Sequence, residues 1–344
     1  MYELLMTLWL AFDDSEEHKS FEIGADWFRG IVEATPDDLR REIHYLGGGK
    51  CVSWSALRGL VARAPAQDID AVLDWLDEME PAEFRRGLLA YSCGRAPRDD
   101  EEIERALAGD ATALAELLEP EEELADYYQT VFSLEQGELK RRMIGALRRF
   151  RDEVYAPHEE EFARTTAKAA AGAAALATGA DPERVIEAVT NGLDYRIQPG
   201  VSRLILVPSV VLRPWAVIDS YQDLLLVAFP VAEEYVTADA DAPPPWVVRA
   251  FKALADDKRL RILRRLAEAP STLDDLAEVL DLTKSTVHHH VGLLRSAGLV
   301  RVVVDPVRQT KTYALRPAIL PGVWEAVDQY LTVPEEEQQV RSQP

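Results

Sequence analysis

The stretch KSTVHHHVGLLRSA, residues 284–297, decides the fold of the C-terminal part of this chain. Three of its apolar residues recur at spacings of four and three, which places them on one face of a helix. They are Val287, Val291 and Leu294. Thr283 can cap the start of this helix, and Gly298 follows its end, where a left-handed glycine commonly stands. We therefore expect a helix with one face committed to a core.

The opposite face of this predicted helix is polar and available for contacts. The residues expected to bind DNA from this helix are Lys284, Ser285, Thr286, His288 and His289. A shorter helix, capped by Ser271 or Thr272, is predicted just before it, and Asp281-Leu282 forms a tight turn between the two. Two short helices joined in this way make a helix-turn-helix, whose second helix can enter the major groove of double-stranded DNA.

The neighbouring segments complete a winged helix. Helices are predicted over residues 246–255 and 258–268, and β-prone runs over 299–304 and 310–315. The buried face of the second helix is expected to hold Leu260, Ile262, Leu263 and Leu266. The two strands and the turn between them would form a hairpin wing. Its basic residues Arg308 and Lys311 are expected to contact phosphates or the minor groove.

This order of elements resembles the winged-helix repressors of the arsenic-resistance-repressor (ArsR) type. The resemblance rests on residues 254–263 (LADDKRLRIL), 276–277 (LA), 285–291 (STVHHHV) and 297–300 (AGLV). It implies that Lys284, Ser285, His288 and His289 face the DNA groove and that His290 packs inward. It also implies a homodimer, formed through the first and last helices, which here are residues 246–255 and 320–331.

The sequence departs from the metal-sensing members of that family. Where their thiolate ligands would fall, this chain has Asp274, Asp275 and Glu278. Their remaining ligands would fall in the last helix, where Glu325 and Asp328 have no neighbouring histidine. Residues 288–290 are consecutive histidines, but adjacent helical residues point about 100° apart and cannot converge on one ion. We expect no metal and no other cofactor.

The charge distribution separates this segment from the rest of the chain. The formal net charge is −22, which by itself argues against a protein that binds phosphates. Residues 246–317, however, hold 13 Lys and Arg against 8 Asp and Glu, whereas residues 1–245 hold 24 against 47. A basic module attached to an acidic domain is typical of a DNA-binding domain joined to a different function.

The chain of 344 residues exceeds what one core usually supports, so more than one domain is expected. The predicted division has four parts: residues 1–237, a helical effector or interaction domain; 238–245, a proline-rich linker; 246–331, the winged helix and dimerisation domain; and 332–344, an acidic tail. Helical periodicity is clear over 68–80, 101–108, 111–118 and 135–155, and an alanine-rich helix over 163–177. Residues 203–231 favour two or three antiparallel strands. The predicted fold class is mainly α with small β elements (α+β).

The leading functional prediction is a homodimeric, cytoplasmic transcriptional regulator that reads an inverted-repeat operator and is modulated by a small-molecule effector. The alternative is a DNA-anchored adaptor whose acidic N-terminal domain docks a protein partner; a third is an enzyme fused to its own regulator. No catalytic arrangement can be recognised, so we expect no enzyme. The glycine run at residues 47–49, followed by Lys50 and Cys51, lacks the spacing of a phosphate loop.

Other features of the sequence limit the possible cellular setting and ligand sites. The two cysteines, Cys51 and Cys93, allow at most one disulfide, and neither a signal peptide nor a membrane helix is predicted. These features favour a cytoplasmic setting. The aromatic residues of the N-terminal domain fit either a core or an effector pocket. They are Trp9, Phe12, Trp27, Phe28, Tyr45, Trp54 and Trp75.

Overall fold

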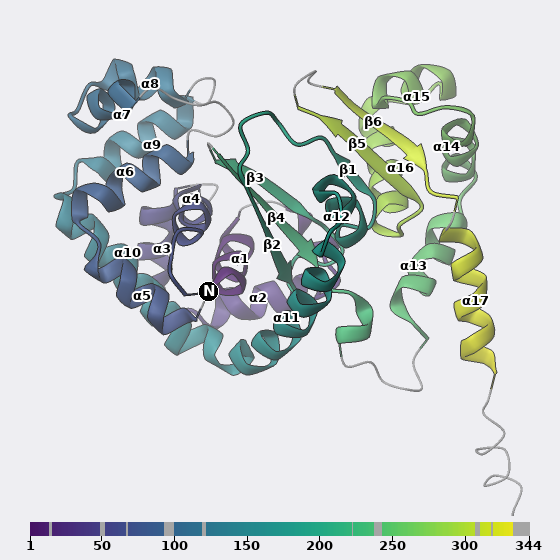
Figure 1. Cartoon of the computed structure of the whole chain (residues 1–344), viewed down its shortest axis with the longest axis horizontal. Coiled ribbons are helices and arrows are strands. Elements are labelled where there is room, and N and C mark those ends of the chain that lie inside the picture. Colours follow the sequence, from purple (N-terminus) through teal and green to yellow (C-terminus); the bar gives the residue numbers. More distant parts are fainter. Residues whose placement is uncertain are drawn as a thin grey trace, which may run out of the picture. The chain divides into compact units, whose positions relative to one another are not determined.

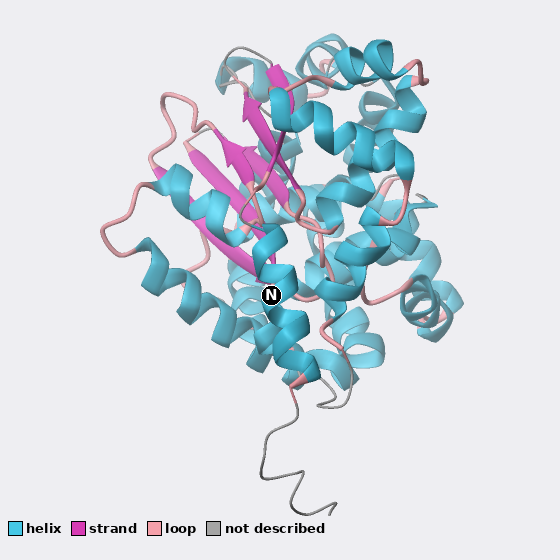
Figure 2. Cartoon of the chain, turned by 90° about the vertical axis from the view of Figure 1, so that its right-hand side faces the viewer, coloured by secondary structure: helices cyan, strands magenta, loops and turns pink. Residues whose placement is uncertain are grey.

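In the computed structural model, the chain folds into two compact units (Figure 1). The N-terminal unit comprises residues 1–170 and 200–231, and the C-terminal unit comprises 171–199 and 232–344. The structure describes residues 1–13, 16–48, 52–66, 68–92, 100–118, 122–221, 223–236, 243–306, 310–317 and 319–332. Helices dominate both units and the strands form two small sheets (Figure 2), which confirms the predicted fold class.

The N-terminal unit is built mainly from helices. Their bounds are α1 (Tyr2–Phe12), α2 (Ala25–Ala34), α3 (Asp37–Gly47), α4 (Val52–Val61), α5 (Ile69–Glu78), α6 (Pro81–Ser92), α7 (Asp100–Leu107), α8 (Ala111–Leu118), α9 (Glu122–Phe132), α10 (Gln136–Phe150) and α11 (Ala156–Ala177). A short 3₁₀ helix spans Glu16–Ser20, and a π-helical turn, Arg151–Tyr155, joins α10 to α11. The helices predicted over 68–80, 101–108, 111–118 and 135–155 are confirmed as α5, α7, α8 and α10 with its π turn.

Helix α1 lies at the centre of the core of this unit. It is apolar around most of its circumference, as expected for a helix that is surrounded by others. Leu4, Leu5 and Leu8 are fully buried. The predicted apolar faces of α5 and α10 join the same cluster. Of the aromatic residues considered above, Phe12, Phe28 and Trp54 are buried in this cluster, and Trp9, Trp27 and Trp75 pack against it.

The sheet of the N-terminal unit has the order β2-β4-β3. Its strands are β2 (Arg203–Ser209), β3 (Val217–Tyr221) and β4 (Leu224–Pro230). β3 pairs with β4 in an antiparallel hairpin, but β2 runs parallel to β4, so the expectation of purely antiparallel strands was wrong. All seven residues of β4 are buried. An apolar run of this kind indicates a strand covered on both faces and carries no information about the direction of its neighbours.

The C-terminal unit contains the winged helix and a segment from earlier in the chain. Its elements are α12 (Pro182–Val189), β1 (Leu193–Tyr195), a 3₁₀ helix (Glu233–Tyr235), α13 (Pro245–Leu254), α14 (Asp257–Glu268), α15 (Leu273–Leu280), α16 (Lys284–Ser296), β5 (Val300–Asp305), β6 (Thr310–Leu315) and α17 (Ile319–Leu331). The Asp181 side chain caps α12 by accepting from the Glu183 N–H, as its position before Pro182 predicts.

Strand β1 joins the sheet of the wing, which has the order β1-β5-β6. β1 runs parallel to β5, with Leu193 opposite Val302, and β6 pairs antiparallel to β5. Residues 171–199 thus group with the C-terminal unit, whereas the sequence analysis placed them in the N-terminal domain. A three-residue strand that pairs with a partner more than a hundred residues away leaves no local signal in the sequence.

The core of the winged helix matches the predicted periodicity with one correction. Val287, Val291 and Leu294 of α16 are buried together with Ile262 and other residues of α14. Leu260, expected on the buried face of α14, is 49% exposed. It lies in the first turn of α14, where the helix extends beyond the core cluster, so helical spacing alone misplaces it.

Candidate nucleic-acid interface

The turn between α15 and α16 fixes the start of the recognition helix. The Thr272 hydroxyl and the Asp275 carboxylate cap α15 reciprocally, each accepting from the other residue's backbone N–H. Asp281 adopts the left-handed conformation, with φ 53°, and ends α15. Thr283 then caps α16 by accepting from the Thr286 N–H. The two helices are therefore held by local hydrogen bonds that the sequence largely predicts.

Helix α16 has the two faces that its spacing predicts. Its apolar face is buried in the core of the winged helix, while Lys284, Ser285, His288 and His289 are exposed. Thr286 is half-buried, and its hydroxyl lies 2.7 Å from the Thr283 hydroxyl. The structure thus brings the predicted residues onto one polar surface and draws the Thr286 side chain into the cap.

An ion pair joins Lys284 to the preceding helix. Its ammonium lies 2.9 Å and 3.0 Å from the two carboxylate oxygens of Asp274 in α15. Both side chains are exposed, so the pair contributes little to stability. The pair instead sets the position of the Lys284 ammonium, which it holds toward α15. Sequence reasoning missed this contact, since a pair ten residues apart across a turn depends on the angle between the two helices.

His290 differs from the two histidines before it. It is half-buried, and its Nδ1 atom is buried without a hydrogen-bond partner. Burial lowers the pKa of His290, and this effect outweighs the opposing influence of Asp256 at the start of α14. The side chain is therefore held in its neutral form near pH 7, as expected for a histidine that packs inward.

The wing adds a basic pair beside α16. Lys311 of β6 is exposed along part of its length, with its ammonium 5.9 Å from the centre of the Tyr313 ring. Burial and the nearby Arg295 guanidinium of α16 lower the pKa of Lys311. Arg295 was not predicted as a DNA contact, although it follows His288 by seven residues, or about two helical turns, and therefore lies on the same side of α16. Arg308, the other predicted wing contact, lies outside the described residues.

The first and last helices of the winged helix expose an apolar surface. Val247 and Ala250 of α13 and Val323 of α17 form a small buried cluster. Beside it, the rings of Phe251 and Trp324 meet edge to face, with centroids 5.6 Å apart. Phe251 is 39% exposed and Trp324 is 64% exposed. Exposed aromatic residues next to one another mark a surface suited to association.

The fold and this polar helix define a winged helix-turn-helix DNA-binding protein. A family model described as "Helix-turn-helix domain" matches residues 254–303. In the part of the chain that the structure describes, no helix is both long enough and apolar enough to cross a bilayer.

Three curated proteins resemble this chain. The HTH-type transcriptional regulator Rv2034 of Mycobacterium tuberculosis is 34% identical over 85 residues, which cover 24% of this chain and 77% of that protein. The HTH-type transcriptional regulator NmtR of the same bacterium is 38% identical over 69 residues, or 20% and 56% of the two chains. The arsenical resistance operon repressor of Bacillus subtilis is 41% identical over 51 residues, or 14% and 49%. The chain belongs to the ArsR family of helix-turn-helix transcriptional regulators.

Proposed function

We propose that this protein is a homodimeric regulator that reads an inverted-repeat operator through α16 and responds to a small molecule bound by its N-terminal unit. The observation that carries the proposal is the division of α16 into a buried apolar face and an exposed polar face. A helix whose inner face is fixed by packing presents its outer face in one orientation, which is what base recognition requires.

The exposed residues of α16 match the hydrogen-bonding groups of the major groove. Lys284 can donate to guanine O6 and N7 once it leaves Asp274, and Ser285 can donate or accept. His288 and His289 can donate to acceptors on base edges or on phosphates. Thr286 supports this surface by holding the cap, because its hydroxyl already pairs with Thr283.

The wing supplies contacts that do not depend on sequence. Lys311 and Arg308 would bind phosphates, and Arg295 adds positive charge beside Lys311. Replacing Lys311 or Arg308 by Ala should weaken binding to every DNA sequence to a similar extent and reduce its salt dependence. A selective change in base preference in either variant would contradict this role.

The apolar surface of α13 and α17 supports the homodimer. Phe251 and Trp324 remain exposed in the single chain, and pairing of two such surfaces around a two-fold axis would cover them. A two-fold protein binds an inverted repeat, with half-site centres separated by roughly 34 to 36 Å, one turn of DNA.

Selection from a random pool of double-stranded DNA tests the proposal. The retained sequences should contain an inverted repeat, and light scattering should give a dimer at micromolar concentration. Trp324→Asp should yield a monomer with weakened operator binding, whereas Gln329→Asp, also exposed on α17, should leave the dimer intact. A monomeric wild-type protein, or a selected site with a single half-site, would overturn the dimer and the operator symmetry.

A further inference from the structure

The N-terminal unit contains a cavity of about 520 Å³. It lies among the start of α1, the start of α5, one side of α11 and strand β2, all within this unit. Its walls are largely apolar, formed by residues such as Ile205, Val207 and Ala167. Small-molecule sites usually have volumes of roughly 300 to 1,000 Å³ and apolar walls with a few polar groups. The cavity has the dimensions of such a site.

A buried carboxylate, Glu3 of α1, lines this cavity. Glu3 is 7% exposed, and its Oε1 atom accepts from the backbone N–H groups of Val210 at 2.8 Å and Val211 at 3.0 Å. Its Oε2 atom is buried and has no hydrogen-bond partner. A buried carboxylate oxygen without a donor lowers the stability of the fold, because its hydrogen bonds to water are lost and no protein donor replaces them. A ligand that donates to Oε2 would remove that cost.

The charges around the cavity indicate whether a ligand that donates to Glu3 would be cationic, neutral or anionic. The ionisable side chains of the cavity apart from tyrosine are Glu3, Asp68 and Glu159, and none of the lining side chains is basic. Met1 also lines the cavity, and burial lowers the pKa of its α-amino group to about 6, so that this amine is mostly uncharged near pH 7. Burial raises the pKa of Glu3, and this effect is larger than the opposing effects of hydrogen bonding from the Ser209 hydroxyl and the Val211 and Val210 N–H groups and of the Met1 amine. The Ser209 hydroxyl makes no hydrogen bond of good geometry to Oε2, which leaves that atom open to a ligand. Arg151 is not part of the lining, but its guanidinium pairs with Glu159, which is.

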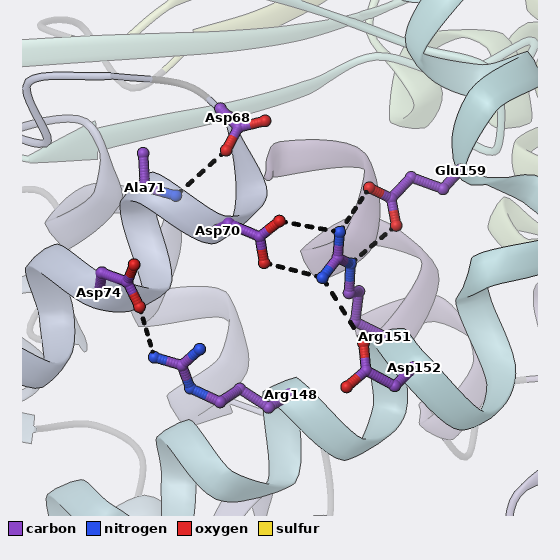
Figure 3. A network of polar contacts seen from close by, with 8 residues as sticks. All are labelled: Asp68, Asp70, Ala71, Asp74, Arg148, Arg151, Asp152 and Glu159. Carbon is purple, nitrogen blue, oxygen red and sulfur yellow. Dashed lines mark hydrogen bonds and ion pairs between the residues drawn. The ribbon is translucent and has the colours of Figure 1, made fainter.

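Figure 3 shows how Arg151 is engaged. From the π turn before α11 it donates to Glu159 at 2.8 Å and 3.1 Å, and to Asp70 at 2.7 Å and 3.1 Å. Asp68 uses one oxygen to accept from the Ala71 N–H. Arg151 also pairs with Asp152, at 3.5 Å. Five carboxylates, including Glu3, therefore stand in this neighbourhood against the Arg151 guanidinium and the mostly uncharged Met1 amine. An anionic ligand would meet repulsion here, and a cationic one would meet attraction.

We propose that this cavity binds an organic cation, with an apolar body against β2 and α11 and a protonated amine that donates to Glu3 Oε2. This assignment rests on the proposed function, because it names the class of small molecule to which the N-terminal unit responds. Tyr155, which is buried and lines the cavity, places an aromatic ring where it can contact such a cation.

Three probes of matched shape test the assignment on the full chain: 4-phenylbutylamine, 4-phenylbutan-1-ol and 4-phenylbutyrate. A ligand that binds the folded state raises the melting temperature, and titration calorimetry then gives the Kd. The amine should bind at least ten times more tightly than the alcohol, and the carboxylate should not bind. Binding of the carboxylate as tightly as the amine would overturn the proposal.

Two variants locate the binding. Glu3→Gln should remove the preference for the amine over the alcohol, whereas Glu42→Gln, which removes a half-buried carboxylate outside the cavity, should preserve it. Ala167→Phe should block both probes by filling the cavity, and it remains informative if Glu3→Gln does not fold. Lys168→Phe, a neighbouring position of α11 outside the lining, is its control. Unchanged amine binding in Ala167→Phe would overturn the proposal.

The result is separable from the proposed function. DNA binding by the same samples, followed by fluorescence anisotropy, reports on the winged helix alone. If the amine does not bind while DNA binding persists, the cavity assignment fails and DNA recognition stands. If the amine binds and leaves the affinity for DNA unchanged, the cavity assignment stands and ligand control of DNA binding fails.

Discussion

The two sheets of this chain share a pairing pattern and differ in burial. In each, the central strand has one parallel and one antiparallel neighbour: β4 lies between β2 and β3, and β5 lies between β1 and β6. Every residue of β4 is buried, whereas only Val300 and Val302 of β5 are buried. The same topology thus serves a closed core in the N-terminal unit and a surface hairpin in the C-terminal unit.

Polar residues follow the same division. Beside the buried sheet, Arg58 of α4 is enclosed and paired with Asp219 of β3, with their Nε and Oδ2 atoms 2.9 Å apart. In the winged helix, Lys284, Ser285, His288 and His289 of α16 are exposed. We infer that polar side chains of the first kind maintain the fold and that those of the second kind contact a partner. Four predictions test this contrast.

The largest effect is expected for Asp219→Ala. Arg58 is only 1% exposed, so removing its partner leaves a buried charge uncompensated. Such a loss costs about 3 to 5 kcal/mol in the free energy of unfolding. Urea titration followed by tryptophan fluorescence measures it. As a control, Asp74→Ala removes the partner of Arg148 in an exposed pair and should unfold close to the wild type. Equal losses in the two variants would contradict the contrast.

A smaller effect, on DNA recognition and not on stability, is expected for Ser285→Ala combined with His289→Ala. Both side chains are exposed, so unfolding should be unchanged. Base contacts are each worth about 1 to 3 kcal/mol of discrimination, so loss of two contacts should lower the preference for operator over scrambled DNA by roughly 30-fold or more. Competition binding measures this ratio. If both affinities fell together, the residues would contact phosphate only, and specificity would lie in the wing or in DNA shape.

Asp274→Asn should have a several-fold effect in the opposite direction. It releases Lys284 from its ion pair, so DNA should bind more tightly. If the released Lys284 contacts guanine, as proposed, the preference for operator over scrambled DNA should also rise; a contact with a phosphate would instead make the slope of log K against log salt steeper by about 0.9. Glu278→Gln removes the same charge from α15 without contacting Lys284 and is the matched control. A gain of equal size in both variants would show that only net charge matters.

The smallest effect concerns pH and His290. Its pKa in the folded chain is lowered by burial, with Asp256 opposing and Arg259, His289 and Lys258 assisting. The unfolded chain therefore binds a proton more readily, and stability should fall as pH drops from about 6.5 toward the lower folded pKa. Melting temperatures between pH 7 and pH 5 measure this trend.

His290→Gln should flatten part of this pH dependence, while His288→Gln, which alters an exposed histidine, should retain it. If the two variants lost the same part of the trend, the half-buried position of His290 would not be its cause.

The sequence predicted those features that are encoded locally. The two faces of α16, the Thr283 cap and the left-handed Gly298, with φ 71°, follow from helical spacing and from the chemistry of helix ends. The buried faces of α5 and α10 follow from the same periodicity. The placing of Lys284, Ser285, His288 and His289 on an exposed surface could likewise be predicted, and their contact with DNA stays a prediction.

The features that sequence reasoning missed depend on distant partners. The pairing of β1 with β5 and the parallel alignment of β2 with β4 are set by the path of the chain between strands. The ion pair of Lys284 with Asp274 depends on an interhelical angle. Glu3 gave no signal as a cavity residue, because the N–H groups that hold it belong to residues 210–211, about two hundred positions later.

Strand β1 limits how this DNA-binding domain can be exchanged between proteins. A chimera that begins at the proline-rich segment near residue 243 would carry α13 to α17 but leave β5 with one edge unpaired, and unpaired edges promote aggregation. A chimera that begins before α12, at Asp181, would retain all three strands. The transferable cassette is therefore discontinuous in the native chain, with the segment of residues 200–231 inserted between its two parts.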